Sequence, residues 1–380
     1  MTFDIGPWLP DFPIRERCLY LDHAAVCPLP RPVADAMRRR IEDQELGGHT
    51  LEKNWVNSTL SCRHVGAELI GCAPEDISLI RSTSEGLSLI AEGLTWKEGD
   101  EVLLGEEEFA ANAAPWLNLK NRGVKIVRFS QPSGRTDPAR IEDLITSRTR
   151  LLALSWVAFH TGWVAPLEEL GTLCRSKGIF LVVDAIQGLG VLPMKMRKFG
   201  LDAVVADSHK WLLGPEGAGL MGTSPALRAQ LRPVLSGWRN IKRIPGDFFL
   251  KEAEFHLDGR RFEPGATNAV GIAGLAAALD LLTTVGPEAL ENRTIMLNKH
   301  LTRILISRGW EVLSPGSGHS VAGIVAARPG GVDPSEARRR LEERHVVCSV
   351  RQALVRFSPH FYVTTPELDA LGHILTKCGM

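Results

Sequence analysis

The sequence has no excess of either charge, no paired-cysteine motif and no long apolar run. Its 44 Lys and Arg residues balance 44 Asp and Glu residues. A nucleic acid or an anionic membrane surface calls for a clustered basic excess, so neither is an expected partner. The seven cysteines are scattered and include no C-x-x-C pair. This usage is typical of reduced thiols in the cytoplasm rather than of a disulfide framework.

Signals for export and membrane insertion are also missing from the sequence. Residues 1–12 have neither the basic nor the apolar segment of a signal peptide. The longest apolar run, 270–279, is too short to span a bilayer. We therefore expect a cytoplasmic protein, and the length of 380 residues predicts more than one domain.

Short apolar runs alternate with amphipathic segments along most of the chain. The runs that predict strands lie at 77–80, 101–104, 124–129, 150–157, 179–183 and 203–206. The segments that predict helices between and before them lie at 51–70, 87–94, 141–145 and 167–176. This alternation predicts an α/β fold with a mostly parallel sheet and right-handed crossovers. We expect an N-terminal arm over 1–30, a large domain over 31–285 and a small C-terminal α+β domain over 286–380.

The stretch 179–221 delivers two opposite charges to one edge of the predicted sheet. One buried run ends on Asp184, and the next is followed by Ser208-His209-Lys210. Ligands bind beyond the carboxyl ends of the strands in such sheets, so the carboxylate and the amine are expected together. Pyridoxal phosphate needs this pair, because a lysine forms its Schiff base and an acid holds its pyridine nitrogen. Two strand-end charges that face water are the alternative.

Two other features fit an anionic ligand. A strand at 77–80 leads into the hydroxyl-rich turn 82–84 and a helix, a geometry that binds phosphate through free N–H groups and the helix dipole. The alternative is an ordinary N-cap, and the turn lacks the lysine of a nucleotide-binding P-loop. Arg356 lies within the otherwise apolar run 355–362. It is either a carboxylate ligand or an exposed residue of an edge strand.

These motifs occur in the order found in class V aminotransferase-like enzymes. The chain resembles that fold-type-I pyridoxal-phosphate group, which includes cysteine desulfurases, kynureninases and isopenicillin-N epimerase, from Tyr20 to the last helix. The most specific element is Asp184-x-x-Gln187, followed by Ser208-His209-Lys210 and Gly214-Pro215. The resemblance implies a large seven-stranded sheet domain, a small C-terminal domain, and a homodimer with its active site at the interface.

The resemblance also implies a role for each site residue. Lys210 forms the Schiff base and carries the proton, Asp184 pairs with the pyridine nitrogen, and Gln187 donates to the ring 3-oxygen. Arg356 grips the substrate carboxylate, which suits a guanidinium fork. The other implied contacts are Thr83, Ser84 and His209 at the phosphate, Phe109 stacked on the ring, and Thr267, which reaches the phosphate from the partner subunit. No metal ligand is implied.

The sequence departs from the family pattern around this site. Phe159 stands near the position of the asparagine that usually touches the ring oxygen, and His160 either replaces that asparagine or packs. Asp207 stands where desulfurases have a phosphate-binding serine, so we expect Ser208 to supply the hydroxyl instead. Phe109 can stack on the ring but cannot move protons.

We expect aminotransferase-type chemistry on a small amino acid, through an external aldimine. A C–S or other β-elimination lyase is one alternative, and a non-catalytic pyridoxal-phosphate-binding relative is another. Cysteine desulfuration needs a nucleophilic thiol on a mobile loop. The nearest cysteine, Cys348, lies in an apolar strand pattern with only a short link to Arg356, so a desulfurase is the less favoured lyase.

Overall fold

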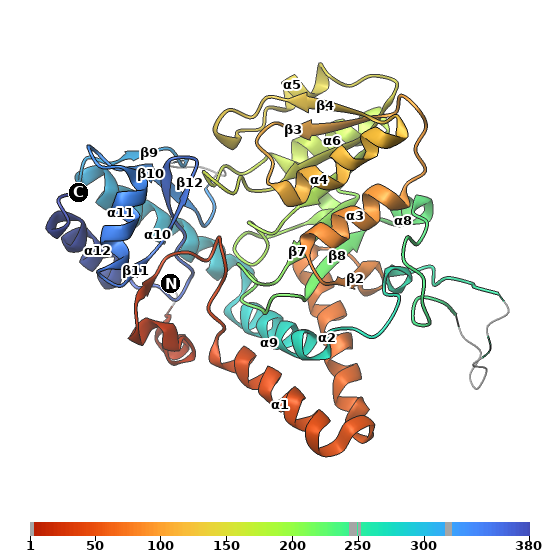
Figure 1. The fold of residues 1–380 in the computed structure, drawn as a ribbon, viewed down its shortest axis with the longest axis horizontal. Helices are drawn as coiled ribbons and strands as arrows, with labels where there is room; N and C mark the ends of the chain where they lie inside the picture. The colour runs from red at the N-terminus through yellow and green to blue at the C-terminus, as the bar shows by residue number, and fades with distance from the viewer. Residues whose placement is uncertain (1–3, 243–248, 250–251, 316–320) are drawn as a thin grey trace.

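The largest element of the fold is a seven-stranded sheet. The computed structural model describes residues 4–242, 249, 252–315 and 321–380. The strand order is β2-β8-β7-β6-β5-β3-β4 (Figure 1). Its strands are β2 (Ile77–Ile80), β3 (Glu101–Gly105), β4 (Lys125–Phe129), β5 (Thr149–Ser155), β6 (Phe180–Asp184), β7 (Ala203–Asp207) and β8 (Gly219–Thr223). Only β8 runs antiparallel to its neighbours, which confirms the predicted α/β fold with a mostly parallel sheet.

Both faces of this sheet are buried. Leu181 and Val183 of β6 belong to one apolar core, whereas Val182 between them belongs to a second core on the opposite face. Successive side chains of a strand point to opposite faces, so a strand covered on both sides reads as a continuous apolar run. This explains why β6 and β7 could be located from the sequence.

Strand β8 was not expected from the sequence. It contains Gly219 and Gly222, and glycine weakens the strand pattern. The structure shows why a small residue is required, because a Cβ at Gly219 would lie 2.6 Å from the carbonyl oxygen of Ala206. β7 and β8 can therefore approach closely only because position 219 is glycine, the same residue type that weakens the strand pattern in the sequence.

Helices flank the large sheet and extend from it. α1 (Arg31–Gly47) and α2 (Glu52–Ile70) both pack against α9 (Ala269–Val285) and project from the sheet as a pair (Figure 1). α3 begins at Thr83, four residues before its predicted start, because Ser82 caps it by accepting a hydrogen bond from the Glu85 amide. The other helices of this part are α3 (Thr83–Gly93), α4 (Ala110–Asn118), α5 (Pro138–Glu142), α6 (Leu167–Lys177), α7 (Met196–Phe199) and α8 (Pro225–Gln230). The 3₁₀ turns are η1 (Gly6–Asp11), η2 (Pro13–Glu16), η3 (Gly48–Leu51), η4 (Pro74–Asp76), η5 (Leu119–Arg122), η6 (Pro132–Gly134) and η7 (Gly259–Phe262).

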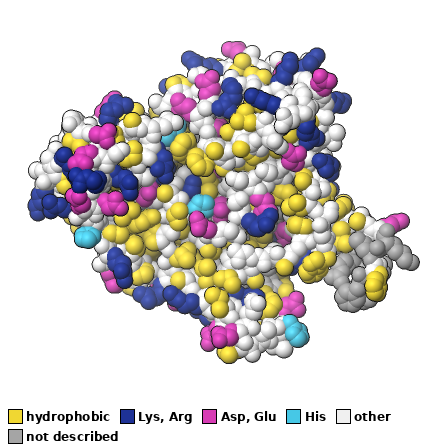
Figure 2. Space-filling view, viewed as in Figure 1, with side chains coloured by type: hydrophobic (Ala, Val, Ile, Leu, Met, Phe, Trp, Pro, Cys, Tyr) yellow, Lys and Arg dark blue, Asp and Glu magenta, His cyan; other side chains and the backbone are white. Residues whose placement is uncertain are grey.

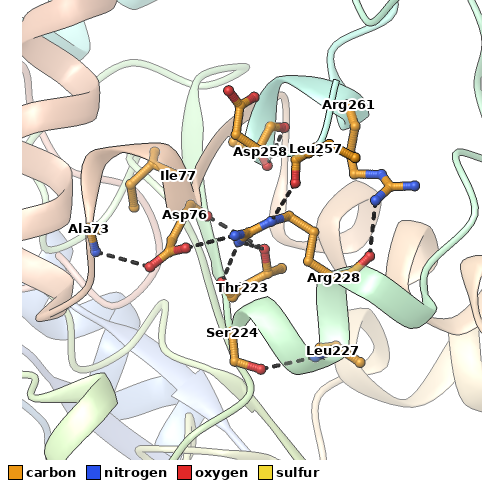
Figure 3. Close-up of polar contacts among 12 residues, drawn as sticks. Ala73, Asp76, Ile77, Thr223, Ser224, Leu227, Arg228, Leu257, Asp258 and Arg261 are labelled. Atoms are coloured by element: carbon orange, nitrogen blue, oxygen red, sulfur yellow. Dashed lines mark hydrogen bonds and ion pairs between the residues drawn. The ribbon is translucent and has the colours of Figure 1, made fainter. Parts of the chain in front are cut away.

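A buried ion pair links the segment just before β2 to the helix that follows β8. Asp76, just before β2, accepts hydrogen bonds from the Ala73 amide and the Arg197 guanidinium, and its carboxylate lies 2.9 Å from Nη2 of Arg228 (Figure 3). Arg228 also donates to the carbonyl oxygens of Thr223 and Leu257. Removing one partner of such a pair leaves an uncompensated buried charge. The cluster therefore holds β2, the end of β8 and the segment before η7 together.

The C-terminal part contains a four-stranded antiparallel sheet in the order β12-β13-β10-β9. Its strands are β9 (Glu311–Val312), β10 (Val325–Arg328), β12 (Ser349–Arg351) and β13 (Leu354–Phe357), and its helices are α10 (Pro287–Ser307), α11 (Pro334–Glu342) and α12 (Thr365–Lys377). The apolar run 346–350 predicts one strand by itself, but the structure divides it into two strands in two sheets. Its first half, β11 (Val346–Val347), pairs with β1 (Leu19–Tyr20) instead.

The N-terminal arm lies on this C-terminal part. β1 runs parallel to β11, and the ring of Phe12 stacks on that of Tyr362 with centroids 3.7 Å apart. Within the described residues, no single helix is long and apolar enough to cross a membrane. α9 and α10 pass that test only as a pair, with an 80° bend between them.

Charges of both signs are interspersed on the face of the molecule shown in Figure 2. Lys and Arg side chains alternate with Asp and Glu around its rim and do not gather into a single patch. This distribution matches the formal net charge of zero.

Candidate active site

A cavity of about 350 Å³ lies beyond the carboxyl ends of β6 and β7. It contains most of the residues predicted to act together. These are Thr83, Ser84, Phe109, Asp184, Gln187, His209, Lys210 and Arg356. They come from strand ends, helix starts and the C-terminal sheet, which is the placement expected for a ligand site in an α/β sheet.

Asp184 is buried and Lys210 is half-buried, and the charge of each affects the pKa of the other. Burial lowers the pKa of Lys210 to about 8, and the charge of Asp184 opposes that shift. Burial raises the pKa of Asp184 to about 7, opposed by the Ile186 amide, which donates to Oδ1 over 3.0 Å, and by Lys210. A lysine with this pKa is partly a neutral amine at physiological pH and can attack a carbonyl.

Two aromatic rings form a wall of the cavity beside the amine. The Phe109 and Phe159 ring centroids lie 5.2 Å apart, edge to face. Nζ of Lys210 lies 5.7 Å from the Phe109 centroid. Phe109 is 46% exposed, so its ring is available for stacking. Neither ring carries a titratable proton, so this wall contributes neither an acid nor a base.

The N-terminal arm supplies another wall, and Gln187 attaches it. The Gln187 amide donates to the carbonyl oxygen of Ala24 over 3.0 Å and accepts from Nε1 of Trp211 over 2.9 Å. Residues 24–26 line the cavity. An amide group has two N–H donors, so one donor of Gln187 remains for a ligand.

The start of α3 provides an anion-binding end. Oγ1 of Thr83 accepts a hydrogen bond from the Asp207 amide over 3.0 Å, which leaves its own proton to donate. Ser84 follows at the second helical position, and both residues line the cavity. The first N–H groups of a helix and its dipole favour an anion at this place.

Asp207 contacts its own neighbours, and Ser208 does not lie where the sequence suggested. Oδ1 of Asp207 accepts from the Ser208 amide, and Oδ2 lies 3.0 Å from Nδ1 of His209, without the geometry of a hydrogen bond. The Ser208 hydroxyl is fully buried and donates to the carbonyl oxygen of Pro215 over 2.6 Å. Ser208 does not line the cavity. The expectation that it supplies a phosphate-binding hydroxyl is corrected, because the loop after Lys210 folds back onto it.

Thr267 and His160 also lie outside the cavity. Thr267 lines two other cavities of the same chain, next to Asn268, which caps α9. Nε2 of His160 lies 2.9 Å from Oε2 of Glu107, and the imidazole is buried. His160 therefore packs, and does not replace the missing asparagine. Its neighbour Phe159 faces the cavity instead.

Arg356 is held rigidly and is not an exposed edge residue. It lies on β13, between β12 and β10, and is 1% exposed. Nε donates to the Ser349 hydroxyl, Nη1 to the carbonyl oxygen of Phe159 over 2.8 Å, and Nη2 to Asp22 over 3.3 Å. A guanidinium has five N–H donors, so two remain for a carboxylate.

Two residues of the site were missed at the level of sequence. Asp22 and Ser349 hold Arg356, and Ser349 also donates to Asp22 over 2.8 Å. Arg351 lines the cavity as a second guanidinium. No local pattern predicts the Asp22 contact, because it lies 334 residues from Arg356 in the chain. Arg351 could be named from the sequence as a candidate for the mouth of the pocket but could not be placed, and the two-residue gap between β12 and β13 is what brings it beside Arg356.

None of the described cysteines lines the cavity. Cys348 is 5% exposed, and burial raises the pKa of its thiol to about 12. Cys27 lies closer to the lysine loop, since its amide donates to the carbonyl oxygen of His209, but burial raises its pKa to about 12 as well. Neither thiol has the exposure or the acidity of a nucleophile.

The donor set of the cavity fits pyridoxal phosphate. It offers a lysine amine of lowered pKa, a buried carboxyl group for a ring nitrogen and a helix start for a phosphate. Residues 19–371 match the sequence model of the family described as Aminotransferase class-V.

The chain belongs to the class-V aminotransferase family. Pyridoxal phosphate is its cofactor, and Lys210 and Asp184 are the groups of the cavity that fit the aldehyde and the pyridine nitrogen. Curated relatives in this family carry different names. A probable cysteine desulfurase of Methanothermobacter thermautotrophicus is 27% identical over 97% of this chain and 96% of the relative. The isopenicillin N epimerase of Streptomyces clavuligerus is 30% identical over 81% of each chain.

Solved structures of class-V enzymes share the fold. The apo cysteine desulfurase of Thermococcus onnurineus superposes with a TM-score of 0.89 at 25% identity, over 99% of this chain and 98% of the other. C-DES, solved with glycine covalently linked to its pyridoxal-phosphate cofactor, also gives 0.89, at 23% identity and over 96% and 98% of the two chains.

Proposed function

We propose that this class-V enzyme acts at the α-carbon of a small amino acid by aminotransferase-type chemistry. One observation carries the proposal: a single cavity combines Lys210, with a pKa of about 8, with the buried carboxyl of Asp184 and the two free donors of Arg356. The wall beside the amine carries only aromatic rings. A single base that takes and returns the proton suits amino transfer, whereas inversion at the α-carbon is served best by bases on both faces.

Each residue has a defined task in this proposal. Arg356 binds the α-carboxylate and orients the α-carbon toward Lys210. Neutral Lys210 removes the α-proton and later returns it. Pyridoxal phosphate, when bound, withdraws the electrons that this step leaves behind. Asp184 keeps the ring nitrogen protonated, and Phe109 with Phe159 keeps water from the reacting carbon.

A β-elimination lyase, with C–S cleavage as its main case, is the second candidate. It is supported by the relatives named cysteine desulfurases and by the same lysine base. A persulfide on a protein thiol is not part of this proposal. β12 and β13 are joined by only Gln352 and Ala353, which leaves no loop to carry a cysteine into the cavity, and Cys348 is buried. Such a lyase would release sulfur without a protein carrier.

A panel of amino acids with and without a keto-acid acceptor tests the two candidates. Amino transfer gives one keto acid and one new amino acid, whereas elimination gives ammonia and pyruvate, with sulfide from a sulfur substrate. Turnover that needs an acceptor supports the first proposal, and sulfide release without an acceptor supports the second. Cys348→Ala is expected to keep full activity in both cases, and its complete loss with cofactor still bound would overturn the thiol-free scheme.

We also propose that the enzyme works as a cytoplasmic homodimer with a shared site. Thr267 lies outside the cavity of its own chain but beside a second cavity of about 850 Å³, whose lining includes the 56%-exposed Trp238. This placement supports a threonine that serves the partner's phosphate site. All seven cysteines are free, in keeping with a reducing compartment. Light scattering of purified protein should give twice the 41.6 kDa chain mass, and a monomer with undiminished cofactor affinity would contradict the shared site.

A further inference from the structure

We propose that Arg351 makes the cavity selective for amino acids whose side chain carries a second anionic group. Arg351 and Arg356 line the same cavity as Lys210. If Arg356 binds the α-carboxylate, a second guanidinium in the cavity has no task for a neutral substrate. The inference rests on the proposed function, because it names the substrate class of the same site.

The hairpin β12–β13 fixes the spacing of the two backbone positions that carry the guanidiniums. Ser349 pairs with Arg356 and Arg351 pairs with Leu354, so Arg351 and Arg356 are diagonal neighbours. Side chains two residues apart share one face of a strand, and diagonal neighbours lie about 7–8 Å apart. This separation lets one small molecule bridge both residues through its two ends.

The two guanidiniums differ in their charge partners. Arg356 lies 3.3 Å from Asp22 and donates to Ser349. Within the described residues, Arg351 has no carboxylate at ion-pair distance, and it donates to the carbonyl oxygen of its neighbour Val350 over 2.8 Å. Asp22 supplies a negative charge to Arg356, and the α-carboxylate of a substrate would add a second negative charge at the same guanidinium. A substrate anion would supply the missing partner of Arg351.

The position of Arg351 is set by a rigid connection. The turn residues Gln352 and Ala353 both adopt positive φ, 47° and 60°. This pair of conformations matches the twist of a two-residue hairpin, so Arg351 is held at the end of β12 and is not part of a loose loop. Arg351 is half-buried, a setting in which a charge-assisted hydrogen bond is stronger than on an open surface.

The kinetic test compares acidic substrates with their neutral amides in the pyridoxal-phosphate-loaded enzyme. We expect wild-type kcat/KM to favour aspartate or glutamate over asparagine or glutamine. Arg351→Gln should lower kcat/KM about 10- to 100-fold for the acids, because it removes a charge-assisted hydrogen bond to the side-chain anion. For the amides, kcat/KM should fall by less than about threefold. Cysteine sulfinate, as a further arm, distinguishes a carboxylate site from one for a sulfur oxyanion.

Arg344→Gln is the matched control. It removes the same charge from an exposed position of the same C-terminal part, and it should leave the ratio of acid to amide unchanged. Equal losses for acids and amides in Arg351→Gln would overturn the inference, since Arg351 would then contribute to the α-carboxylate. A wild-type preference for neutral amino acids would also overturn it.

A binding measurement separates this inference from the proposed reaction. Succinate and butyrate lack an amine and cannot turn over, so calorimetry on the loaded enzyme reports binding alone. Succinate should bind about tenfold more tightly than butyrate to wild type and about equally to Arg351→Gln. If no amino acid is turned over but this preference is found, the reaction proposal fails and the anion site stands. Equal binding of both acids to wild type overturns the anion site even if turnover is present.

Discussion

Lys210 shows how one half-buried residue sets the working pH of the site. Burial lowers its pKa from 10.5 to about 8, and only the neutral amine attacks the cofactor aldehyde. The rate at which cofactor-free protein takes up pyridoxal phosphate should therefore rise with pH and reach half its maximum near pH 8. Stopped-flow absorbance measures this rate. A midpoint near 10.5 would contradict the lowered pKa of this amine, and Lys210→Ala should show no borohydride-fixed cofactor at any pH.

Asp184 gives a second pH effect, on the stability of the cofactor-free protein. Its pKa rises from 3.8 to about 7 on burial, so the folded state binds the extra proton between these values. The stability that this group contributes is present below pH 4 and is lost as pH rises through 7. The free energy of unfolding of Asp184→Asn should thus exceed that of wild type by roughly 2–4 kcal/mol at pH 8 and equal it at pH 4. Urea unfolding at both pH values measures it, and an equal change at both would rule out the linkage.

The sequence located the reactive residues better than it located their supports. Asp184 and Lys210 could be found because each follows a buried apolar run. The supports of Arg356 could not, since Asp22 is distant in sequence and Ser349 has no distinctive neighbours. Ser208 was assigned to the phosphate because Asp207 stands where relatives have a phosphate-binding serine. Its hydroxyl instead bonds to the carbonyl oxygen of Pro215, a contact that only the tertiary fold creates.

At the scale of elements, the hairpin β12–β13 carries strain that a substitution can relieve. Gln352 and Ala353 adopt positive φ, which favours asparagine and glycine. The double change Gln352→Asn with Ala353→Gly should stabilise the protein by about 0.5–1 kcal/mol. Urea unfolding monitors it, and kcat/KM should stay within about twofold because Arg351 and Arg356 keep their spacing. A loss of stability would show that this turn has another geometry in solution.

Elements with a clear period were predictable, and those that depend on partners were not. The sequence predicts one long helix over 287–307, and α10 has the same bounds in the structure. The apolar run at 346–350 was interpreted as one strand, yet it crosses between two sheets, because β11 finds its partner in the N-terminal arm. The rest of the fold decides which neighbour a short strand pairs with, so the residues of the strand itself do not predict its partner.

At the scale of the whole molecule, thiol accessibility reports on the packing of all its parts. Cys27, Cys62, Cys174 and Cys348 are buried, and burial raises the pKa of each to about 12. Only the partly exposed Cys18 and Cys378 should react with a thiol reagent within minutes at pH 8, because burial raises the pKa of the half-buried Cys72 to about 12 as well. All seven should react in urea. Fast labelling of Cys348 in the folded protein, read by peptide mass spectrometry, would reopen a sulfur-carrying role.

The contact of Asp22 with Arg356 has a consequence for how the protein is made. The arm leaves the ribosome first, and its partner follows 334 residues later. At about 5–20 residues per second, translation separates them by tens of seconds. The seven-stranded sheet, complete by Thr223, has time to form before the two arginines of the cavity, Arg351 and Arg356, are translated. A nascent chain can therefore be largely folded while its site is still open, and competence to bind substrate becomes the last property that the polypeptide acquires.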